Sequence, residues 1–386
     1  MRKGTTEGLR QVNLSTTLGI LYRSGPASRA VLSKRTGRNR STIASLVTDL
    51  VELGLVTEHE PDAQRQVGRP SPVVGIRQQV VAIAVNPEID ALTLGLVGLD
   101  GRVRRVIRHE YDRIPTAAEV IGITADLIAG LRELDGLVVA GMGVAVPGQV
   151  RTRDGLVRNA PHLGWHDEPL GGPLADATGY PVQVANDAAL GALAEHEFGT
   201  GRHKDHLIYL NGGASGIGGG VISDGSPLGG TSGYAGELGH IRVSSSGRVD
   251  SAGIAGTLEA EVSRADLLEA LGLARAEPGQ FEEALLADRS PRVSAVVERQ
   301  LDHLGSALAA AINVLNPQVV ALGGFLATLQ AYDPDRLARA VARSTLAPSL
   351  EGVRITAAEL GADLLMVGAA GLAFRPLLAD PASISR

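Results

Sequence analysis

From Val80 onward, short apolar runs with a two-residue period alternate with alanine- and leucine-rich stretches of helical period. The runs VVAIAV and LTLGLVGLDGRV read as strands, and AAEVIGITADLIAGL reads as a helix. Strands that alternate with helices in this way are typical of α/β folds. The 386 residues suffice for about two or three domains, each with its own core. The chain after its first quarter is therefore predicted to be α/β.

Glycine-rich turns follow β-branched runs at three places in this part of the chain. The stretches LVVAGMGVAVPGQV, HLIYLNGGASGIGGGVISDG and PQVVALGGFLA each read as strand, turn and strand. Because glycine has no Cβ, the backbone at such a turn can come close to a ligand. Three of these turns in one chain predict a cleft between two α/β lobes that holds a small molecule.

Residues 1–77 differ from the rest of the chain in charge. They carry 12 Lys and Arg against 6 Asp and Glu, whereas the remainder carries 24 against 36. A basic segment on an acidic body favours a polyanionic partner for that segment. A basic but merely solvated segment would have the same charge, so the pattern within residues 1–77 has to decide between the two.

That pattern predicts three short amphipathic helices. Asn13, Ser28 and Asn39 are each placed to cap the start of one of them. Val31 is expected to face inward from the second helix, and Gly37 to end that helix in a left-handed conformation. The third helix then follows after a tight turn. Two short helices joined by a glycine-containing turn are typical of a helix-turn-helix.

The third helix opens with cationic and hydroxyl side chains, which can donate to base edges and phosphates. After it, LVTEHEPDAQRQVGRPSPVVGI reads as two short strands around the basic tip Gly68-Arg69-Pro70, which completes a winged helix. A three-helix dimerisation or docking module would share the apolar periodicity, but the charge and the wing favour DNA. The candidate DNA-binding residues are Arg38, Arg40, Ser41, Thr42, Ser45 and Arg69.

The absence of cysteine excludes disulfides, thiolate nucleophiles and zinc sites built on sulfur. The N-terminus MRKGTTEGLR has no apolar leader, and no stretch of about 18 apolar residues free of Gly or Pro follows. We therefore expect a cytoplasmic protein without a membrane partner.

Several motifs of the body resemble those of the ROK family, which contains sugar kinases and sugar-responsive repressors with a two-lobed, actin-like or ribonuclease H-like fold. The matching stretches between residues 146 and 374 are VPGQV, RNAPHLGWHD, ANDAALGALAE, GIGGGVISDG, GYAGELGHIRV, NPQVVALGG and GADLLMVGAAGLA. With the winged helix in front, the chain is most similar to the repressor branch. The resemblance implies a winged helix-turn-helix over 1–77, a first lobe over 78–190 completed by 361–386, and a second lobe over 191–360.

The resemblance also implies a set of sugar-binding positions. Short polar side chains of this kind can pair with the hydroxyl groups of a polyol. Asp187 matches the base that deprotonates the attacked hydroxyl in the family's kinases. Taken alone, Asn186 and Asp187 would also fit as a cap for the helix that AALGALAEHE predicts. The implied sugar-binding residues are Gly148, Asn159, Asn186, Asp187, Glu237, His240 and Glu259.

The chain departs from the family's kinases where their first phosphate loop, Asp-x-Gly-Gly-Thr, would lie. Here the loop reads Asn86-Pro87-Glu88-Ile89-Asp90. Both glycines are gone, proline removes an amide donor, and two carboxylates bring negative charge to the place of polyphosphate. The second glycine-rich stretch, from Ala214 to Gly220, keeps most of its glycines but does not restore the loop. We therefore expect neither ATP binding nor enzymatic activity.

A second departure concerns the zinc segment that the resemblance implies, Cys-x-Cys-Gly-x-x-Gly-Cys-x-Glu. Asp250, Ala252 and Thr257 stand at its three cysteine positions. The sequence therefore predicts a loop without zinc and a protein without a cofactor. A cation between His240 and Asp250 stays open as an alternative, but it would need further ligands.

Together these features predict a sugar-responsive transcriptional repressor that binds operator DNA and a sugar or sugar phosphate. Two half-sites on the operator imply a homodimer or a dimer of dimers. One alternative is a sugar kinase with a DNA-binding appendage, and another is a binding module that responds to a protein partner. The expected effect of the sugar is release from DNA, although strengthened binding is also compatible with the pattern.

Overall fold

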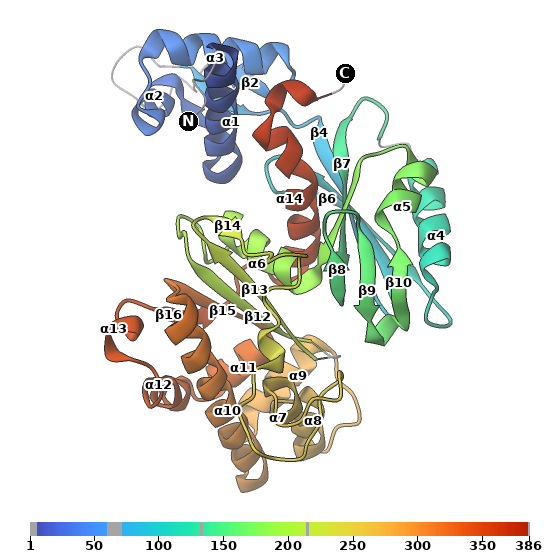
Figure 1. Cartoon of the computed structure of the whole chain (residues 1–386), viewed down its shortest axis with the longest axis vertical. Coiled ribbons are helices and arrows are strands. Elements are labelled where there is room, and N and C mark those ends of the chain that lie inside the picture. Colours follow the sequence, from blue (N-terminus) through green and yellow to red (C-terminus); the bar gives the residue numbers. More distant parts are fainter. Residues whose placement is uncertain (1–5, 60–71, 132–133, 214–215, 385–386) are drawn as a thin grey trace. The chain divides into compact units, whose positions relative to one another are not determined.

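The computed structural model describes residues 6–59, 72–131, 134–213 and 216–384 (Figure 1). Contacts within the chain divide it into two compact units. The first unit consists of Met1–Ala145, Leu170–Val184 and Ala369–Arg386, and the second of Val146–Pro169 and Ala185–Gly368. Neither unit is a continuous piece of sequence.

A helical segment with a small sheet begins the first unit. The helices are α1 (Thr6–Ser24), α2 (Arg29–Thr36) and α3 (Arg40–Glu52). The strands β1 (Ala27–Ser28), β2 (Val56–His59) and β3 (Val73–Ile76) pair antiparallel in the order β1-β3-β2. Helices α2 and α3 followed by this hairpin form a winged helix, which confirms the prediction. The predicted wing tip, Gly68-Arg69-Pro70, lies outside the described residues.

Local hydrogen bonds set the ends of α2 and α3. Ser28 Oγ accepts from the Val31 backbone N–H at 3.3 Å, and Asn39 Oδ1 accepts from the Thr42 backbone N–H at 2.8 Å. Gly37 ends α2 with a left-handed φ of 68°. The two predicted caps and the predicted glycine stop are confirmed.

Two predictions for the winged helix are wrong. Helix α1 begins at Thr6, so Asn13 lies inside it and does not cap it. The apolar pattern starts late because Leu9 and Val12, in the first turns, are 57% and 59% exposed. Val31 is 40% exposed instead of facing inward, because only one side of the short helix α2 faces the core.

A mixed sheet forms much of the first unit. In the described chain its spatial order is β11 (Val182–Asn186), β7 (Val138–Val146), β4 (Val80–Pro87), β5 (Ala91–Gly98) and β6 (Val103–Glu110). Strand β4 pairs parallel with β7 and antiparallel with β5. Helices α4 (Ala117–Ala129) and α5 (Gly171–Thr178) cover one face, and α14 (Leu364–Ala379) covers the other (Figure 1).

Helix α14 joins the winged helix to this sheet. A Cβ on Gly143 of β7 would lie 1.8 Å from the Ala369 carbonyl oxygen, so α14 lies directly on the strand. Phe374 of α14 packs edge to face against Tyr22 of α1, with ring centroids 6.2 Å apart. Both rings are almost fully buried. Helices α1 and α14, which are far apart in the sequence, therefore share one hydrophobic core.

The second unit contains two sheets in its described part. One has the order β10 (Trp165–Pro169), β9 (Leu156–Ala160) and β8 (Gln149–Arg151). The other has the order β14 (Ser226–Pro227), β13 (Ile217–Ser223), β12 (Leu207–Gly212), β15 (Val319–Gly324) and β16 (Arg354–Ala357). The larger sheet pairs β12 parallel with β15 and antiparallel with β13.

Helices surround the larger sheet. They are α6 (Asp187–Glu197), α7 (Leu258–Glu261), α8 (Arg264–Leu271), α9 (Pro278–Ala287), α10 (Pro291–Leu315), α11 (Phe325–Tyr332), α12 (Pro334–Ala342) and α13 (Ala347–Leu350). The short 3-10 helices of the same unit are η2 (Pro161–Leu163), η3 (Leu238–His240) and η4 (Gly361–Asp363), and η5 (Pro381–Ser383) follows α14 in the first unit. Helix α10 supplies much of the core through a stripe of helical period. Its buried residues include Val293, Val297, Leu301, Leu304 and Leu308.

The alternation of strands and helices confirms the predicted α/β class, but one predicted turn is wrong. After β15 the glycine pair leads into helix α11 and not into a second strand. Phe325, Leu326 and Leu329 are buried at helical spacing, which the short apolar run after the glycines did not reveal.

One helical stretch of the described chain, Gly361–Ala379, is long and apolar enough by length and composition to cross a membrane. Of its apolar window, 56% is buried inside the protein. Met366, Val367, Ala370 and Phe374 belong to the core. A core helix of a globular protein has these properties as well, so the stretch is weak evidence for a membrane span.

Candidate functional site

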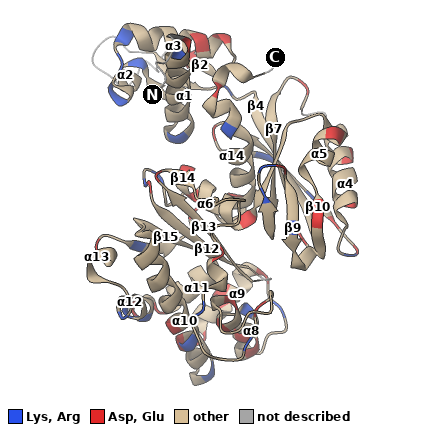
Figure 2. Cartoon of the chain, viewed as in Figure 1, with Lys and Arg blue, Asp and Glu red and all other residues tan. Residues whose placement is uncertain are grey.

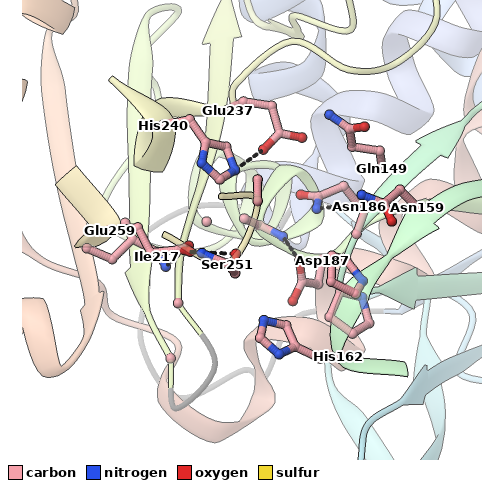
Figure 3. Close-up of a pocket in the computed structure, with 18 of the residues that line it drawn as sticks. Gln149, Asn159, His162, Asn186, Asp187, Ile217, Glu237, His240, Ser251 and Glu259 are labelled. Atoms are coloured by element: carbon pink, nitrogen blue, oxygen red, sulfur yellow. Dashed lines mark hydrogen bonds and ion pairs between the residues drawn. The ribbon is translucent and has the colours of Figure 1, made fainter. Parts of the chain in front are cut away.

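A pocket in the second unit brings together residues that are far apart in the sequence. It has a volume of about 290 Å³ and is bordered by the start of α6, the ends of β12 and β13, and the segment from Glu237 to Glu259 (Figure 3). All positions at which the sequence predicts sugar binding are among its lining residues. These are Gly148, Asn159, Asn186, Asp187, Glu237, His240 and Glu259.

Two side chains at the start of α6 line the pocket and also hold the helix end. Asn186 Oδ1 accepts from the Ala189 backbone N–H at 2.9 Å, and its Nδ2 donates to the Gly148 carbonyl at 3.0 Å. Asp187 Oδ1 accepts from the Ala188 backbone N–H at 2.8 Å. The capping interpretation of this pair is thus confirmed, and capping does not remove either residue from the pocket.

The neighbouring wall is formed by a close approach of two backbone segments. A Cβ on Gly148 would lie 2.4 Å from the Asn159 carbonyl oxygen, so a larger residue would push β9 away. The side-chain Oδ1 of Asn159 is buried and accepts no hydrogen bond from the described residues. A buried acceptor without a donor costs about 1–3 kcal/mol, and a hydroxyl group of a bound molecule could supply that donor.

His240 and Glu237 face each other across η3. The His240 Nε2 lies 3.9 Å from Glu237 Oε2, and Figure 3 shows both side chains at one end of the pocket. The other ring nitrogen, Nδ1, lies 2.8 Å from Asp250 Oδ2. Because the Asp250 carboxylate fixes Nδ1, the ring is oriented with Nε2 toward Glu237.

Asp250 is the centre of a buried hydrogen-bond network, which we call the Asp250 clasp. Its Oδ1 accepts from the backbone N–H groups of Ala252 and Ile254, each at 2.9 Å. Its Oδ2 accepts from the Thr257 hydroxyl at 2.8 Å and from His240. Burial alone would raise the pKa of the Asp250 carboxyl, but these hydrogen bonds outweigh burial and lower it. The clasp therefore holds an ionised carboxylate inside the loop before α7.

Glu259 braces the opposite side of the pocket. Its Oε2 accepts from the Ile217 backbone N–H at 3.0 Å. Its Oε1 accepts from the Ser251 backbone N–H at 3.0 Å and from the Ser251 hydroxyl at 2.6 Å. A Cβ on Gly216, whose φ is +155°, would lie 2.3 Å from this carboxylate. Glu259 thus ties the start of β13 to the clasp loop, and protein donors already occupy both of its oxygens.

The residues at the implied zinc segment do not fit a zinc ion. Ala252 has no ligand atom, the Thr257 hydroxyl donates to Asp250, and both Asp250 oxygens already accept hydrogen bonds. Among the described residues, no group of three or more His, Asp or Glu side chains could hold a metal ion. In this loop, hydrogen bonds to Asp250 thus take the place of the bonds to zinc that the family resemblance implies.

The pocket also contains polar residues that the sequence did not single out. His162 and Gln149 lie within stretches that carried the family resemblance, so their positions could have suggested them. Asn211 precedes a glycine-rich turn at the end of β12. Ser251 gave no signal, because only its contact with Glu259 places it in the wall.

The segment Asn86–Asp90 forms a tight turn between β4 and β5. Asn86 and Pro87 belong to β4, and the Glu88 backbone N–H donates to the Ala91 carbonyl at 2.8 Å. Arg108 of β6 lies 2.7 Å from Asp90 and 3.7 Å from Glu88. Burial raises the pKa of Glu88, and the nearby Asp90 raises it further, more than Arg108 lowers it. The turn is thus rich in carboxylates and braced by one arginine.

The start of α3 presents polar side chains on the winged helix. Arg38, Arg40 and Ser41 are exposed, and Thr42 is half-buried. Ser45 accepts a hydrogen bond from Arg10 Nη2 at 3.2 Å, and the same guanidinium lies 2.5 Å from Asp49. Figure 2 shows basic residues on α2 and acidic residues toward the end of α3. The positive charge is therefore concentrated at the turn between the two helices.

Two family descriptions match different parts of the chain. The ROK family matches residues 88–375, and the MarR family matches residues 15–66. The two matches cover the α/β body and the winged helix respectively.

Individual relatives cover different shares of the chain. The xylose repressor of Bacillus subtilis (strain 168) is 28% identical over 319 residues, which are 81% of this chain and 82% of that protein. A glucokinase of Thermotoga maritima is 32% identical over 249 residues, 60% of this chain and 78% of that protein. The crystal structure of a ROK family transcriptional regulator, described as a homolog of the E. coli MLC protein, has a TM-score of 0.78 at 25% identity. That similarity covers 96% of this chain and 97% of the regulator.

Proposed function

Because the chain belongs to the ROK family and carries a MarR-type winged helix, we propose that it is a sugar-responsive transcriptional repressor. In this proposal the winged helix binds operator DNA and the pocket of the second unit binds the sugar. One observation carries the proposal: a single chain holds both a winged helix and a pocket lined by every predicted sugar-binding position.

The chemistry of the pocket supports a monosaccharide as the ligand. A volume of about 290 Å³ is near the lower end of the range for small-molecule sites. Carboxylates, amides and imidazoles line it, and each can pair with a hydroxyl group. The buried Asn159 Oδ1 is an acceptor that a ligand hydroxyl would satisfy. We propose that Asn159, Asp187, Glu237 and His240 contact the sugar, while Gly148, Asn186 and Glu259 shape the walls.

We assign the DNA contacts to the first turn of α3 and the residues before it. Arg40 and Thr42 lie where a recognition helix meets base edges, so they would influence which sequence is bound. Arg38, Ser41 and Ser45 would contact the DNA backbone, and so would Arg69, which lies outside the described residues. Backbone contacts of this kind raise affinity without selecting a sequence.

The test is to couple the two binding events in the full-length protein. An operator is first selected from a random DNA pool by the protein itself, and its release is then followed by fluorescence anisotropy while sugars are added. Asp187→Ala and His240→Ala should bind the operator as the wild type does and lose the response to sugar. Asp335→Ala, an exposed change in the same unit, should keep the response. Wild-type responses in both pocket variants would place the effector site elsewhere.

A sugar kinase with a DNA-binding appendage is the second candidate, because Asp187 matches the position of the kinase base. We propose that phosphoryl transfer is lost, since the turn at 86–90 offers a proline and two carboxylates in place of free glycine amides. A coupled assay for ADP release with common hexoses and pentoses tests this. Turnover above about 1 per second would identify a working kinase.

We propose that the repressor acts as a homodimer or a dimer of dimers, because paired winged helices bind two half-sites of one operator. We retain the functional division into a DNA-binding domain over 1–77, a first lobe over 78–190 with 361–386, and a second lobe over 191–360. A repressor acts in the compartment that holds the DNA, so we expect it in the cytoplasm. Light scattering of the purified protein, alone and with operator, measures the assembly.

A further inference from the structure

We propose that the effector is an uncharged sugar without a phosphate group, an inference that rests on the proposed function and specifies its ligand. The charged groups that line the pocket are the carboxylates of Asp187, Glu237 and Glu259. No Lys or Arg is among the described residues of the lining. The pocket is therefore anionic wherever its carboxylates are ionised.

A phosphorylated sugar would bring about −1.5 to −2 charges into this pocket at neutral pH. Proteins hold phosphate with arginine or lysine side chains, or with unoccupied backbone N–H groups at a helix start. Since the described lining holds no Lys or Arg, the phosphate would lose its hydration and face three carboxylates. The hydroxyl groups of an uncharged sugar would instead be attracted, because carboxylates are strong hydrogen-bond acceptors for them.

The helix start at the pocket is not open to an anion. Helix α6 begins at the pocket, and its first N–H groups would otherwise attract a phosphate. The Ala188 N–H is taken by the Asp187 carboxylate and the Ala189 N–H by the Asn186 side chain. The chain's own carboxylate thus occupies the place that a phosphate would take.

The histidines of the pocket do not provide a cation for phosphate either. His240 lies between two carboxylates, 2.8 Å from Asp250 and 3.9 Å from Glu237. A proton on this ring would therefore be neutralised by groups of the protein itself. His162, on η2, faces the carboxylate of Asp187 across the pocket (Figure 3).

Arginines do occur in an adjoining cavity of about 260 Å³, which shares Glu259 and Ser251 with the pocket. Arg248 there places Nη1 and Nη2 at 2.9 and 3.1 Å from the two oxygens of Asp266. Arg264 donates to a backbone carbonyl at 2.6 Å and lies over the ring of Phe281. Both guanidinium groups are engaged, and the carboxylate of Glu259 stands at the border between the two cavities. This cavity therefore does not extend the pocket into a phosphate site.

Calorimetric titration of the full-length protein at pH 8 and low salt tests the inference. The probes are D-glucose, D-galactose, D-mannose, D-xylose and N-acetyl-D-glucosamine, each as the free sugar and as its 1-phosphate, with the 6-phosphates of the hexoses added. Every sugar that binds should bind at least about tenfold more weakly in its phosphorylated forms. A phosphorylated form that binds more tightly than its free sugar would overturn the inference and leave the proposed repressor function intact. No binding by any probe in either form would reject the proposed function, and the inference with it.

A pair of variants tests the electrostatic cause. Glu237→Gln removes one pocket charge and keeps the shape of the side chain, whereas Glu282→Gln removes a charge from an exposed position on α9. Glu237→Gln should reduce the affinity ratio of free to phosphorylated sugar by about threefold or more. Glu282→Gln should leave that ratio at its wild-type value. An unchanged ratio in Glu237→Gln would show that the pocket carboxylates do not exclude phosphate.

Discussion

The winged helix and the pocket hold their polar side chains in different ways. In the winged helix, Asn39 caps α3 through a residue three positions away, and the polar side chains before and after it are exposed. In the pocket, Asn186 contacts a residue 38 positions away, and Glu259 contacts one 42 positions away. A substitution of an exposed polar side chain of the winged helix should therefore change binding alone, whereas a substitution of Asn186 or Glu259 should also remove a contact that stabilises the fold.

The largest effect is expected at the Asp250 clasp. Asp250→Ala leaves two backbone N–H groups, the Thr257 hydroxyl and His240 without their acceptor inside the protein. We expect the free energy of unfolding to fall by about 3 kcal/mol, because buried donors then lack partners. Urea unfolding followed by circular dichroism measures the loss.

The exposed Asp335 of α12 provides the matched control for this substitution. Asp335→Ala should change the free energy of unfolding by about 0.5 kcal/mol or less. If Asp250→Ala lowers the free energy of unfolding no more than this control does, the Asp250 clasp does not stabilise the loop. The proposed difference between the pocket and the winged helix would then be wrong.

A smaller effect, and on binding only, is expected for Arg40→Ala in the winged helix. Arg40 is exposed and is absent from the core, so unfolding should be unchanged. Operator affinity should fall by about 1–3 kcal/mol, as for the loss of a base contact. Arg275→Ala, an exposed change on the body, should leave operator affinity as it is. Operator affinity retained in Arg40→Ala would remove α3 from the interface.

The same contrast explains which features could be predicted from the sequence. The caps at Ser28 and Asn39 and the stop at Gly37 were predictable, because each depends on residues within one helical turn. The first turns of α1 were missed, since Leu9 and Val12 are exposed and break the apolar pattern. A helix end could therefore be predicted from neighbouring residues only where contacts within one helical turn determine it.

The glycine-rich turns predicted a ligand-binding cleft, but the individual residues of the pocket were predictable only through the family resemblance. Nothing near Asp250 in the sequence indicates that its carboxylate gathers donors from both sides of a loop. The contact between Ser251 and Glu259 likewise depends on how the clasp folds. Helix α11 was taken for a strand because its apolar run after β15 is too short to show a period. The Asp250 clasp, the contact between Ser251 and Glu259 and helix α11 depend on tertiary contacts, which cannot be predicted from neighbouring residues in the sequence.

The smallest expected effect comes from one substitution made in both regions. Asn39→Asp and Asn186→Asp each keep a capping oxygen, because aspartate caps helices as well as asparagine does. Asn186 also donates to the Gly148 carbonyl, whereas the side-chain hydrogen bonds of Asn39 within the described part of the chain all lie near its own position. We expect Asn186→Asp to lower the free energy of unfolding by about 1 kcal/mol, and Asn39→Asp to lower it by much less. Urea unfolding measures both changes. Equal losses in the free energy of unfolding would show that the distant contact of Asn186 adds no stability beyond that of a local cap.

The edge-to-face contact between Tyr22 and Phe374 has a consequence for the genetics of this protein. A stop codon in place of the Phe374 codon would spare every residue that lines the pocket, yet it would expose the buried side of α1. Such a truncated protein should lose repression even though the residues that line the pocket are all still encoded. Alleles that cause constitutive expression are therefore expected in the codons of α14 as well as in those of α3.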